Sequence, residues 1–430
     1  MKVAIVGCGS RHQMFRDAIT GPFSDRHELV ALCDSNPKRL ALSAEAVPRR
    51  NGNGVATYLA GDFDRLLAEQ APDAVIVSTP DHLHGDYIVR ALEAGSDVIC
   101  EKPLTIDLET LKRITDAQAR TGRRVTVTFN YRYSPARTQV YDLLASGMIG
   151  DVVAVDFRWY LDRVHGADYF RRWHRQKDNS GGLLVHKSTH HFDLLNWWLG
   201  TRPEEVFASG RRAVYRPETA AGMGLTDYGP RCATCADAEK CDYRLDLESD
   251  DNIRRLYREA EDEDGYFRDR CVFDPSIGIE DTMQVHIRYA SGVSANYTLT
   301  AYAPWEGLEV EFHGTRGTLR HRHVEKHGIL GGKGSLADVE CMSTTLHLAG
   351  EEPREIDVAT GKGAHGGADP VMLGYILAPD SMPGETRGRA SDHVAGGWSI
   401  LTGIAANEAI ATRGVVSIPA MLARHGIRLG

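Results

Sequence analysis

Several features are missing from this 430-residue sequence, and each absence excludes a class of protein. There is no excess of basic residues: 50 Lys and Arg face 59 Asp and Glu, and no Lys/Arg block is long enough to follow a phosphate backbone. A nucleic-acid-binding surface is therefore not expected. No apolar run approaches the ~20 residues that cross a bilayer. The first residues lead straight into an apolar strand pattern, without the features of a signal peptide.

Cysteine is scarce as well, with eight residues in the whole chain. This is too few for a secreted disulfide scaffold, and we expect a cytoplasmic protein with reduced thiols. Four of the eight, Cys232, Cys235, Cys241 and Cys271, fall within one stretch and begin with a C-x2-C spacing. Four thiolates can hold a structural zinc ion. Free buried thiols or a disulfide are the alternatives.

The length of 430 residues favours two domains. The first third alternates short apolar runs at residues 3–6, 29–33, 74–78, 97–100 and 125–129 with helical patterns at 13–19, 63–69, 87–94 and 108–120. Such alternation predicts an α/β fold with a doubly wound parallel sheet. We place this domain at residues 1–129 and a second domain at 130–430, with a cysteine-containing insertion at about 210–275.

The first strand pattern runs into Gly7-Cys8-Gly9-Ser10-Arg11, which opens a helix. Two glycines permit a tight turn and the close approach of a pyrophosphate to the helix N-terminus, although His12 replaces the usual third glycine. Asp34 ends the second strand, where an acidic residue binds the adenosine ribose and repels a 2′-phosphate. NAD is therefore favoured over NADP, and Lys38 and Arg39 are the residues that argue for NADP.

Two more strand ends carry polar residues, in 78–84 and in Glu101-Lys102-Pro103. Ligands of doubly wound sheets bind beyond the carboxyl ends of the strands, so these residues are expected at the same crevice. The expected cofactor-binding residues are Gly7, Gly9, Ser10, Arg11, Asp34, Thr79, Pro80, His84, Glu101, Lys102 and Asn130.

The densest group of polar residues lies at 186–193, just before two tryptophans. If this stretch is one helix ending at Gly200, then His186, His190 and Asp193 share one face, while Lys187 and His191 form a second pair. The pattern predicts the lining of a pocket. A surface helix with scattered histidines and a metal site built on the histidines are the alternatives.

Residues 162–174 mix polar and aromatic side chains, as carbohydrate pockets do. A charged loop around a buried Trp173 is the alternative. The expected substrate-binding residues are Arg132, Asp162, His165, Tyr169, Trp173, Lys187 and Asp193. Further along, we expect a solvated acidic helix at 246–264, a glycine-rich loop at 361–369 that either closes over the site or only connects, and an amphipathic helix at 396–413.

Taken together, these motifs resemble the Gfo/Idh/MocA oxidoreductases (glucose–fructose oxidoreductase, inositol dehydrogenase, rhizopine catabolism). The matching residues are Gly7, Gly9, Thr79, Pro80, His84, Glu101, Lys102, Pro103, Asn130, Tyr131 and Arg132. The resemblance continues through residues 181–193, 279–283, 312–319 and 403–410, and so covers nearly the whole chain.

The resemblance implies an N-terminal Rossmann domain and a C-terminal α/β domain with a large open antiparallel sheet. It also implies bound NAD(H) or NADP(H), sugar or cyclitol substrates, and homodimers or homotetramers formed through that sheet. Lys102 matches the catalytic lysine of the family and His190 matches its histidine. His186 stands where family members commonly have an aspartate.

We therefore expect an NAD-dependent oxidoreductase that transfers a hydride between nicotinamide and a hydroxyl-bearing carbon of a sugar, cyclitol or glycoside. Lys102, His190 and His186 are the expected catalytic residues. Lys187 and the histidines give a cationic lining that favours an acidic or heavily hydroxylated ligand. The alternatives are an NAD-dependent glycoside hydrolase, which works by transient oxidation, elimination, water addition and re-reduction, and an NAD-binding sensor without chemistry.

Overall fold

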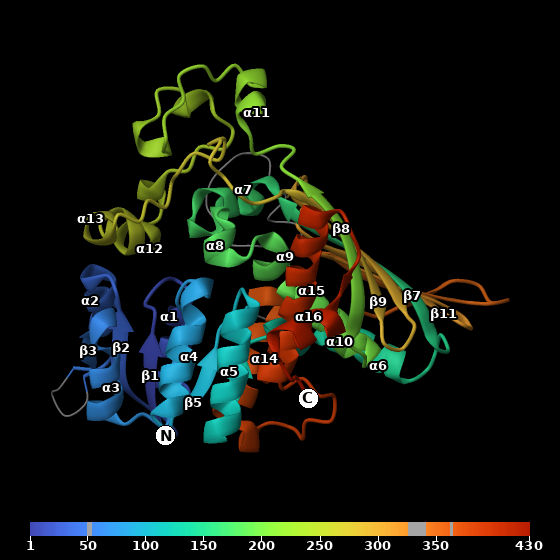
Figure 1. Cartoon of the computed structure of the whole chain (residues 1–430), viewed down its shortest axis with the longest axis horizontal. Coiled ribbons are helices and arrows are strands. Elements are labelled where there is room, and N and C mark those ends of the chain that lie inside the picture. Colours follow the sequence, from blue (N-terminus) through green and yellow to red (C-terminus); the bar gives the residue numbers. More distant parts are fainter. Residues whose placement is uncertain (50–53, 326–340, 362–363) are drawn as a thin grey trace.

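Two β-sheets organise the computed structural model, which describes residues 1–49, 54–325, 341–361 and 364–430 (Figure 1). The first sheet has six parallel strands in the order β3-β2-β1-β4-β5-β6. Its strands are β1 Lys2–Val6, β2 Glu28–Asp34, β3 Ala56–Leu59, β4 Ala74–Val77, β5 Asp97–Cys100 and β6 Val125–Val127. Its helices are α1 His12–Thr20, α2 Pro37–Glu45, α3 Phe63–Gln70, α4 His84–Glu93 and α5 Leu108–Thr121.

The strands of this sheet are apolar at nearly every position because helices cover both faces. The strand order reverses between β1 and β4, which opens a crevice at the carboxyl ends of the strands. The doubly wound parallel sheet expected from the sequence is thereby confirmed.

The second sheet has nine strands in the order β14-β13-β12-β11-β7-β10-β9-β8-β15. They are β7 Val152–Asp162, β8 Pro203–Arg211, β9 Thr282–Tyr289, β10 Ser294–Ala303, β11 Gly307–Gly314, β12 Gly317–Val324, β13 Cys341–Leu348, β14 Arg354–Ile356 and β15 Val416–Ser417. Among the described strand pairs of this second sheet, β7–β10 is parallel and the others are antiparallel. Burial alternates along β9, as expected when helices cover one face of a sheet.

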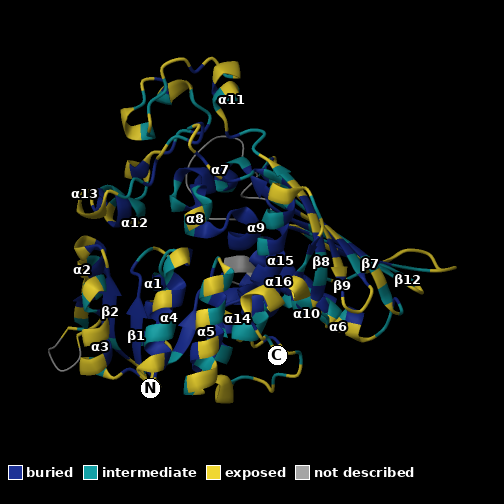
Figure 2. Ribbon diagram, viewed as in Figure 1, coloured by how far each residue is buried: buried dark blue, intermediate teal, exposed yellow. Residues whose placement is uncertain are grey.

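Helices α10 (Thr189–Leu199) and α15 (His393–Thr412) pack close together and cover this sheet (Figure 2). Helix α10 is mostly buried, and the buried residues of α15 lie between Gly396 and Ala409. The sequence predicted that α15 is amphipathic, with one buried and one exposed face. Instead, buried residues, many of them Gly, Ala, Ser or Thr, occur around most of the helix circumference. Gly403 shows why they are small, since a Cβ there would lie 2.3 Å from the Leu184 carbonyl oxygen of α9 (Leu183–His186). This close approach fixes the backbone of the polar cluster.

The chain between β8 and β9 forms the insertion, an arm that turns back over α2 (Figure 1). It holds α11 (Pro217–Gly222), α12 (Asp251–Ile253) and α13 (Glu261–Asp264). The single acidic helix expected at 246–264 is wrong, because Asp246 and Asp250 bond to backbone amides and start new short turns. Nor is the segment fully solvated, since Tyr257 is buried.

The remaining helices are α6 Pro135–Ala145, α7 Arg163–Arg171, α8 Lys177–Ser180, α14 Ala364–Leu377 and α16 Ile418–His425. The glycine-rich loop expected at 361–369 is wrong from residue 364 onward, where α14 begins; residues 362–363 lie outside the described part. Leu373 and Leu377 of α14 pack in the core of the first domain. Across the described residues, no helix is both long and apolar enough to cross a membrane.

Candidate active site

A cavity of about 860 Å³ lies between the two sheets and receives residues from both domains and from the insertion. All eleven expected cofactor-binding residues line it, and so do the three expected catalytic residues. Four of the seven expected substrate-binding residues also line it: His165, Tyr169, Trp173 and Lys187.

The glycine loop after β1 follows the geometry that a dinucleotide needs. Gly7 has a φ of +91°, and a Cβ there would lie 2.6 Å from the backbone of Ser78. Only glycine fits this close approach. His12, in place of the third glycine, is buried and bridges the Gly9 carbonyl and the Ser43 hydroxyl, so it braces the loop from behind. The change at His12 therefore leaves the cavity open.

Asp34 lies at the end of β2, where its carboxylate accepts hydrogen bonds from the amides of Cys8 at 2.5 Å and Asn36 at 2.7 Å. Across the cavity, Arg11 pairs with Glu101 at 2.8 Å and with Asp369 of α14 at 3.2 Å. Asn130 donates to Asp369, and its own Oδ1 is a buried acceptor with no partner among the described residues. These donors and acceptors fit a dinucleotide lying across the strand ends.

Lys102 follows β5, and the neighbouring turn is held by His84, whose ring bridges the carbonyls of Pro103 and Thr79 at 2.8 and 2.9 Å. Lys102 Nζ donates to the His186 carbonyl oxygen at 3.3 Å. Burial lowers the pKa of Lys102 from 10.5 to about 8, although the carboxyl groups of Asp81 and Glu101 oppose this. A lysine of this kind exchanges protons near neutral pH.

His186 is paired with a carboxyl group that the sequence analysis did not assign. Its Nδ1 lies 2.5 Å from Asp81 Oδ2, and both side chains are buried in the cavity wall. Burial, together with the charges of Lys102 and Arg172, lowers the pKa of His186 well below its ordinary value. Burial raises the pKa of Asp81, against the opposing effect of Lys102. The first domain therefore supplies a carboxyl group next to His186.

The stretch at 186–193 is not one helix, which corrects the expectation of shared faces. Gly181 and Gly182 have positive φ, α9 ends at His186, and α10 starts at Thr189. His190 lines the cavity and stacks on Tyr131, with 4.3 Å between ring centroids. Lys187 also lines it, with Nζ 4.6 Å from the centroid of Trp159. His191 points away and bonds to Tyr297 in the core.

The aromatic wall of the cavity comes from α7 and the turn that follows it. Tyr169 and His165 are joined at 3.0 Å, and His165 Nδ1 lies 2.7 Å from Glu306. Trp173 stacks on His174, whose ring lies 4.2 Å from His186. His174 Nδ1 is buried with no partner in the described part of the chain. This wall presents polar groups beside aromatic rings, as expected for residues 162–174.

Three expected substrate-binding residues do not line the cavity. Arg132 and Asp193 form a buried ion pair, with Nη2–Oδ1 and Nε–Oδ2 distances of 2.5 and 2.7 Å. Asp162 caps the N-terminus of α7 by accepting from the amides of Val164 and His165. Because these groups are used within the protein, we assign them to positioning the helices and not to binding substrate.

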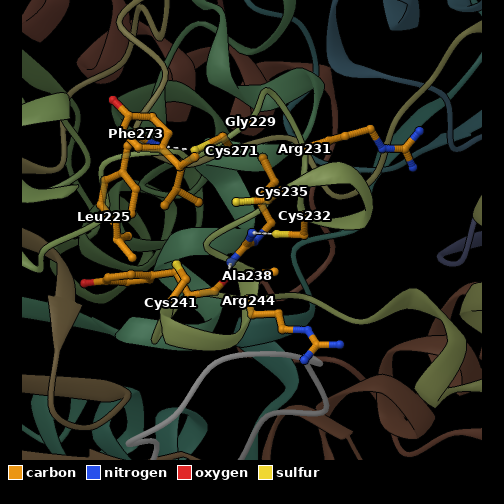
Figure 3. Close-up of a pocket in the computed structure, with 14 residues that line it drawn as sticks. Leu225, Gly229, Arg231, Cys232, Cys235, Ala238, Cys241, Arg244, Cys271 and Phe273 are labelled. Atoms are coloured by element: carbon orange, nitrogen blue, oxygen red, sulfur yellow. Dashed lines mark hydrogen bonds between the residues drawn. The ribbon is translucent and has the colours of Figure 1, made fainter. Parts of the chain in front are cut away.

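The four cysteines of the insertion line one small cavity (Figure 3), which includes Arg171 and Phe273. Cys232 accepts hydrogen bonds from Arg171 and from the Leu245 amide, each at 3.4 Å. Within the described residues, however, no group of three or more His, Cys, Asp or Glu side chains is placed to hold a metal ion. This arrangement does not support the expected zinc site, and it equally gives no support to a metal at the histidines of 186–191. All four cysteines are free thiols.

Sequence reasoning missed several residues that line the cavity: Asp81, Tyr131, Arg172, His174, Tyr257, Asp264 and Tyr266. Asp81, Arg172 and His174 lie inside residues 78–84 and 162–174, which the sequence already indicated as polar stretches near the site. Their place in these stretches could have identified them. Tyr257, Asp264 and Tyr266 come from the insertion, and no local pattern relates them to the glycine loop, since Tyr257 is 247 residues from Ser10 in the chain.

Comparison with known proteins shows the family to which the chain belongs. A family model described as the NAD-binding Rossmann fold of the GFO_IDH_MocA oxidoreductase family matches residues 1–129, and the model of its C-terminal alpha/beta domain matches residues 142–371. The protein YteT of Bacillus subtilis (strain 168), named as an oxidoreductase, is 37% identical over 379 residues, which are 86% of this chain and 87% of that protein. Inositol 2-dehydrogenase of Rhizobium meliloti (strain 1021) is 29% identical over 49% of this chain and 58% of its own length.

Two solved structures share the fold. One is the WlbA dehydrogenase of Bordetella pertussis in complex with NADH and UDP-GlcNAcA, with a TM-score of 0.62, 20% identity and coverage of 97% of this chain and 98% of that one. The other is myo-inositol 2-dehydrogenase of Lactobacillus plantarum, with a TM-score of 0.62, 16% identity and coverage of 97% and 99%. With both family models matched in sequence order and the glycine loop, Lys102 and His190 gathered at one cavity, the chain belongs to the Gfo/Idh/MocA family of NAD-binding oxidoreductases.

Proposed function

We propose that this oxidoreductase is an NAD-dependent dehydrogenase that acts on a secondary hydroxyl of a sugar or cyclitol. The observation that carries the proposal is the convergence of Lys102, His186 and His190 on one cavity with the glycine loop and Asp34. The relatives named inositol 2-dehydrogenase and the WlbA complex with a nucleotide sugar support a polyhydroxylated substrate.

The residues present fit the cofactor. The backbone of Gly7 and Gly9 leaves room for a pyrophosphate, and Asp34 lines the same cavity, where its carboxylate is the group we expect to accept a hydrogen bond from a ribose hydroxyl. Asn130 offers a buried acceptor that has no protein partner among the described residues. When bound, NAD supplies the nicotinamide ring that accepts or returns the hydride.

The proton is handled by the chain itself. Lys102, with its pKa lowered to about 8, takes the proton from the reacting hydroxyl in oxidation and returns it in reduction. His190, held flat against Tyr131, hydrogen-bonds the same oxygen and fixes its direction. His186 uses Nδ1 to meet Asp81, which leaves Nε2 for a neighbouring hydroxyl of the substrate.

The pair of His186 and Asp81 replaces the aspartate that the family commonly has at position 186. With Nδ1 engaged by Asp81, a neutral His186 offers Nε2 to one substrate hydroxyl, as an acceptor when Asp81 is ionised and as a donor when Asp81 carries the proton. Lys187, buried beside Trp159, adds a cation that favours a hydroxyl-rich or acidic substrate. None of these contacts, and none of the comparisons, favours the glycoside hydrolase alternative.

The test is a panel of cyclitols, aldoses and uronates with NAD⁺, followed by the absorbance of NADH. Lys102→Met is expected to lower kcat by at least ~100-fold while NAD⁺ binding persists. Asp81→Asn is expected to lower kcat by roughly tenfold, and the matched exposed variant Asp86→Asn to leave it unchanged. Full turnover by Lys102→Met, or no NADH with any polyol or sugar, contradicts the proposal.

A further inference from the structure

Residues 250–266 of the insertion, here called the insertion segment, contain α12 and α13 and lie beside α2 of the first domain (Figure 1). Tyr257, Asp264 and Tyr266 line the same cavity as Asp34. The Tyr257 hydroxyl accepts a hydrogen bond from the Ser10 amide at 3.2 Å.

The segment is also fixed to the start of α2, directly after Asp34. Asn36 Nδ2 donates to the Ala260 carbonyl at 2.9 Å, and Gln13 of α1 donates to Asn252 at 3.0 Å. The cofactor site therefore has a wall that the Rossmann domain does not supply.

This wall brings acidic groups to the two cations that argued for NADP in the sequence. Lys38 Nζ lies 3.3 Å from Glu263 Oε1 and donates to the Glu259 carbonyl at 2.9 Å. The Arg39 guanidinium is paired with Asp264 through Nη2, and its Nε lies 3.5 Å from Asp34 Oδ1.

Both cations are thus engaged before a cofactor arrives. A 2′-phosphate placed beside Asp34 would be repelled by the carboxylates of Asp264 and Asp34, which already pair with the Arg39 guanidinium. It would have to compete for Arg39, whose side chain is only 10% exposed and therefore has little freedom to turn to a new partner. A ribose with a free 2′-hydroxyl meets no such repulsion and can donate to Asp34.

We propose that Glu263 and Asp264 of the insertion are specificity-determining residues, which make the site selective for NAD by holding Arg39 and Lys38 away from a 2′-phosphate. The inference rests on the proposed function only in requiring that a nicotinamide dinucleotide binds this cavity. It assigns to the insertion a role in choosing the cofactor.

The test compares the affinities of the full-length protein for NAD⁺ and NADP⁺ by isothermal titration calorimetry. Asp264→Asn is expected to lower the Kd for NADP⁺ by about tenfold, because a freed guanidinium forms charge-assisted bonds to phosphate. The ratio of the Kd for NADP⁺ to the Kd for NAD⁺ is therefore expected to fall by about tenfold. Asp262→Asn is the matched control, since Asp262 is exposed two residues away and has the same charge.

A second variant guards against misfolding. Glu263 and Lys38 lie at the surface with side chains 34% and 46% exposed, so Glu263→Gln is expected to fold normally and to tighten NADP⁺ binding about threefold. The inference is overturned if Asp264→Asn and Glu263→Gln change NADP⁺ binding no more than Asp262→Asn does. If the unmodified protein binds neither dinucleotide, the proposed function falls, and the inference with it.

Discussion

At Lys102, burial and neighbouring charge act in opposite directions on one ammonium group. Burial is the larger effect and lowers the pKa to about 8, whereas Asp81 and Glu101 raise it. The neutral amine that can accept a proton therefore becomes the main form above about pH 8. We predict that kcat for alcohol oxidation rises with pH through this region and then levels, as measured by NADH formation between pH 6 and 10.

The same shift affects stability. Between the folded pKa of about 8 and the ordinary value of 10.5, the unfolded chain binds a proton that the folded chain has released, so the contribution of Lys102 to stability increases with pH over this window. In Lys102→Met, the rise of kcat with pH and the rise of stability with pH should both disappear. A pH profile of residual activity with the same inflection would show that another group titrates.

The buried ion pair of Arg132 and Asp193 either binds substrate or only holds the helices in position, and variants of the pair distinguish these two roles. Removing one partner leaves the other charge buried, so Arg132→Met is expected to lower the free energy of unfolding by roughly 3–5 kcal/mol. The double variant Arg132→Met/Asp193→Leu should recover part of this loss. Because the pair lies outside the cavity lining, KM should stay unchanged in the double variant; a large rise in KM would return Arg132 to the substrate site.

At the scale of elements, the insertion depends on one residue at its end. Asp281 is fully buried, and its carboxylate accepts hydrogen bonds from the amides of Ala213, Val214 and Tyr215 at 2.8, 2.7 and 3.1 Å. It thereby ties the beginning of the insertion to its end.

We predict that Asp281→Ala costs about 3 kcal/mol of stability, because three buried donors lose a charged acceptor. Thermal unfolding measures this loss, and Asp246→Ala, which removes an exposed cap on the Glu248 amide, is the control and should cost ~1 kcal/mol or less. Because the insertion also forms a wall of the cavity, NAD⁺ affinity should fall with Asp281→Ala. Unchanged affinity in a folded variant would mean that the wall does not need this tie.

At the scale of the whole molecule, helices cover one face of the second sheet. Phe207 of β8 is exposed between the buried Val206 and Ala208, so its side chain lies on the other face. We propose that copies of the chain associate through this open face, as the family resemblance led us to expect. Light scattering is expected to give a dimer or tetramer, and Phe207→Glu to shift it toward the monomer. A monomer for the unmodified protein at micromolar concentration would contradict the proposal.

Much of the fold could be predicted because local patterns decide it. Continuous apolar runs between helical patterns lead to a doubly wound sheet, and the glycine at position 7 is required by its turn. The break between α9 and α10 lies at Lys187 and Ser188. It was not predictable from spacing, since neither residue is a glycine or a proline that would mark the end of a helix. In the same way, nothing local shows that Arg132 and Asp193 pair with each other.

The sequence by itself determined the cofactor domain and the position of Lys102 at the end of one of its strands, because strand ends of a doubly wound sheet meet at one crevice whatever else the chain does. Only the tertiary structure decided that Asp81 pairs with His186, and that Glu263 and Asp264 pair with Lys38 and Arg39. The physical reason is distance along the chain. Charge pairing acts over a few ångströms in space, and these partners are brought that close only by the packing of the second domain and its insertion on the first.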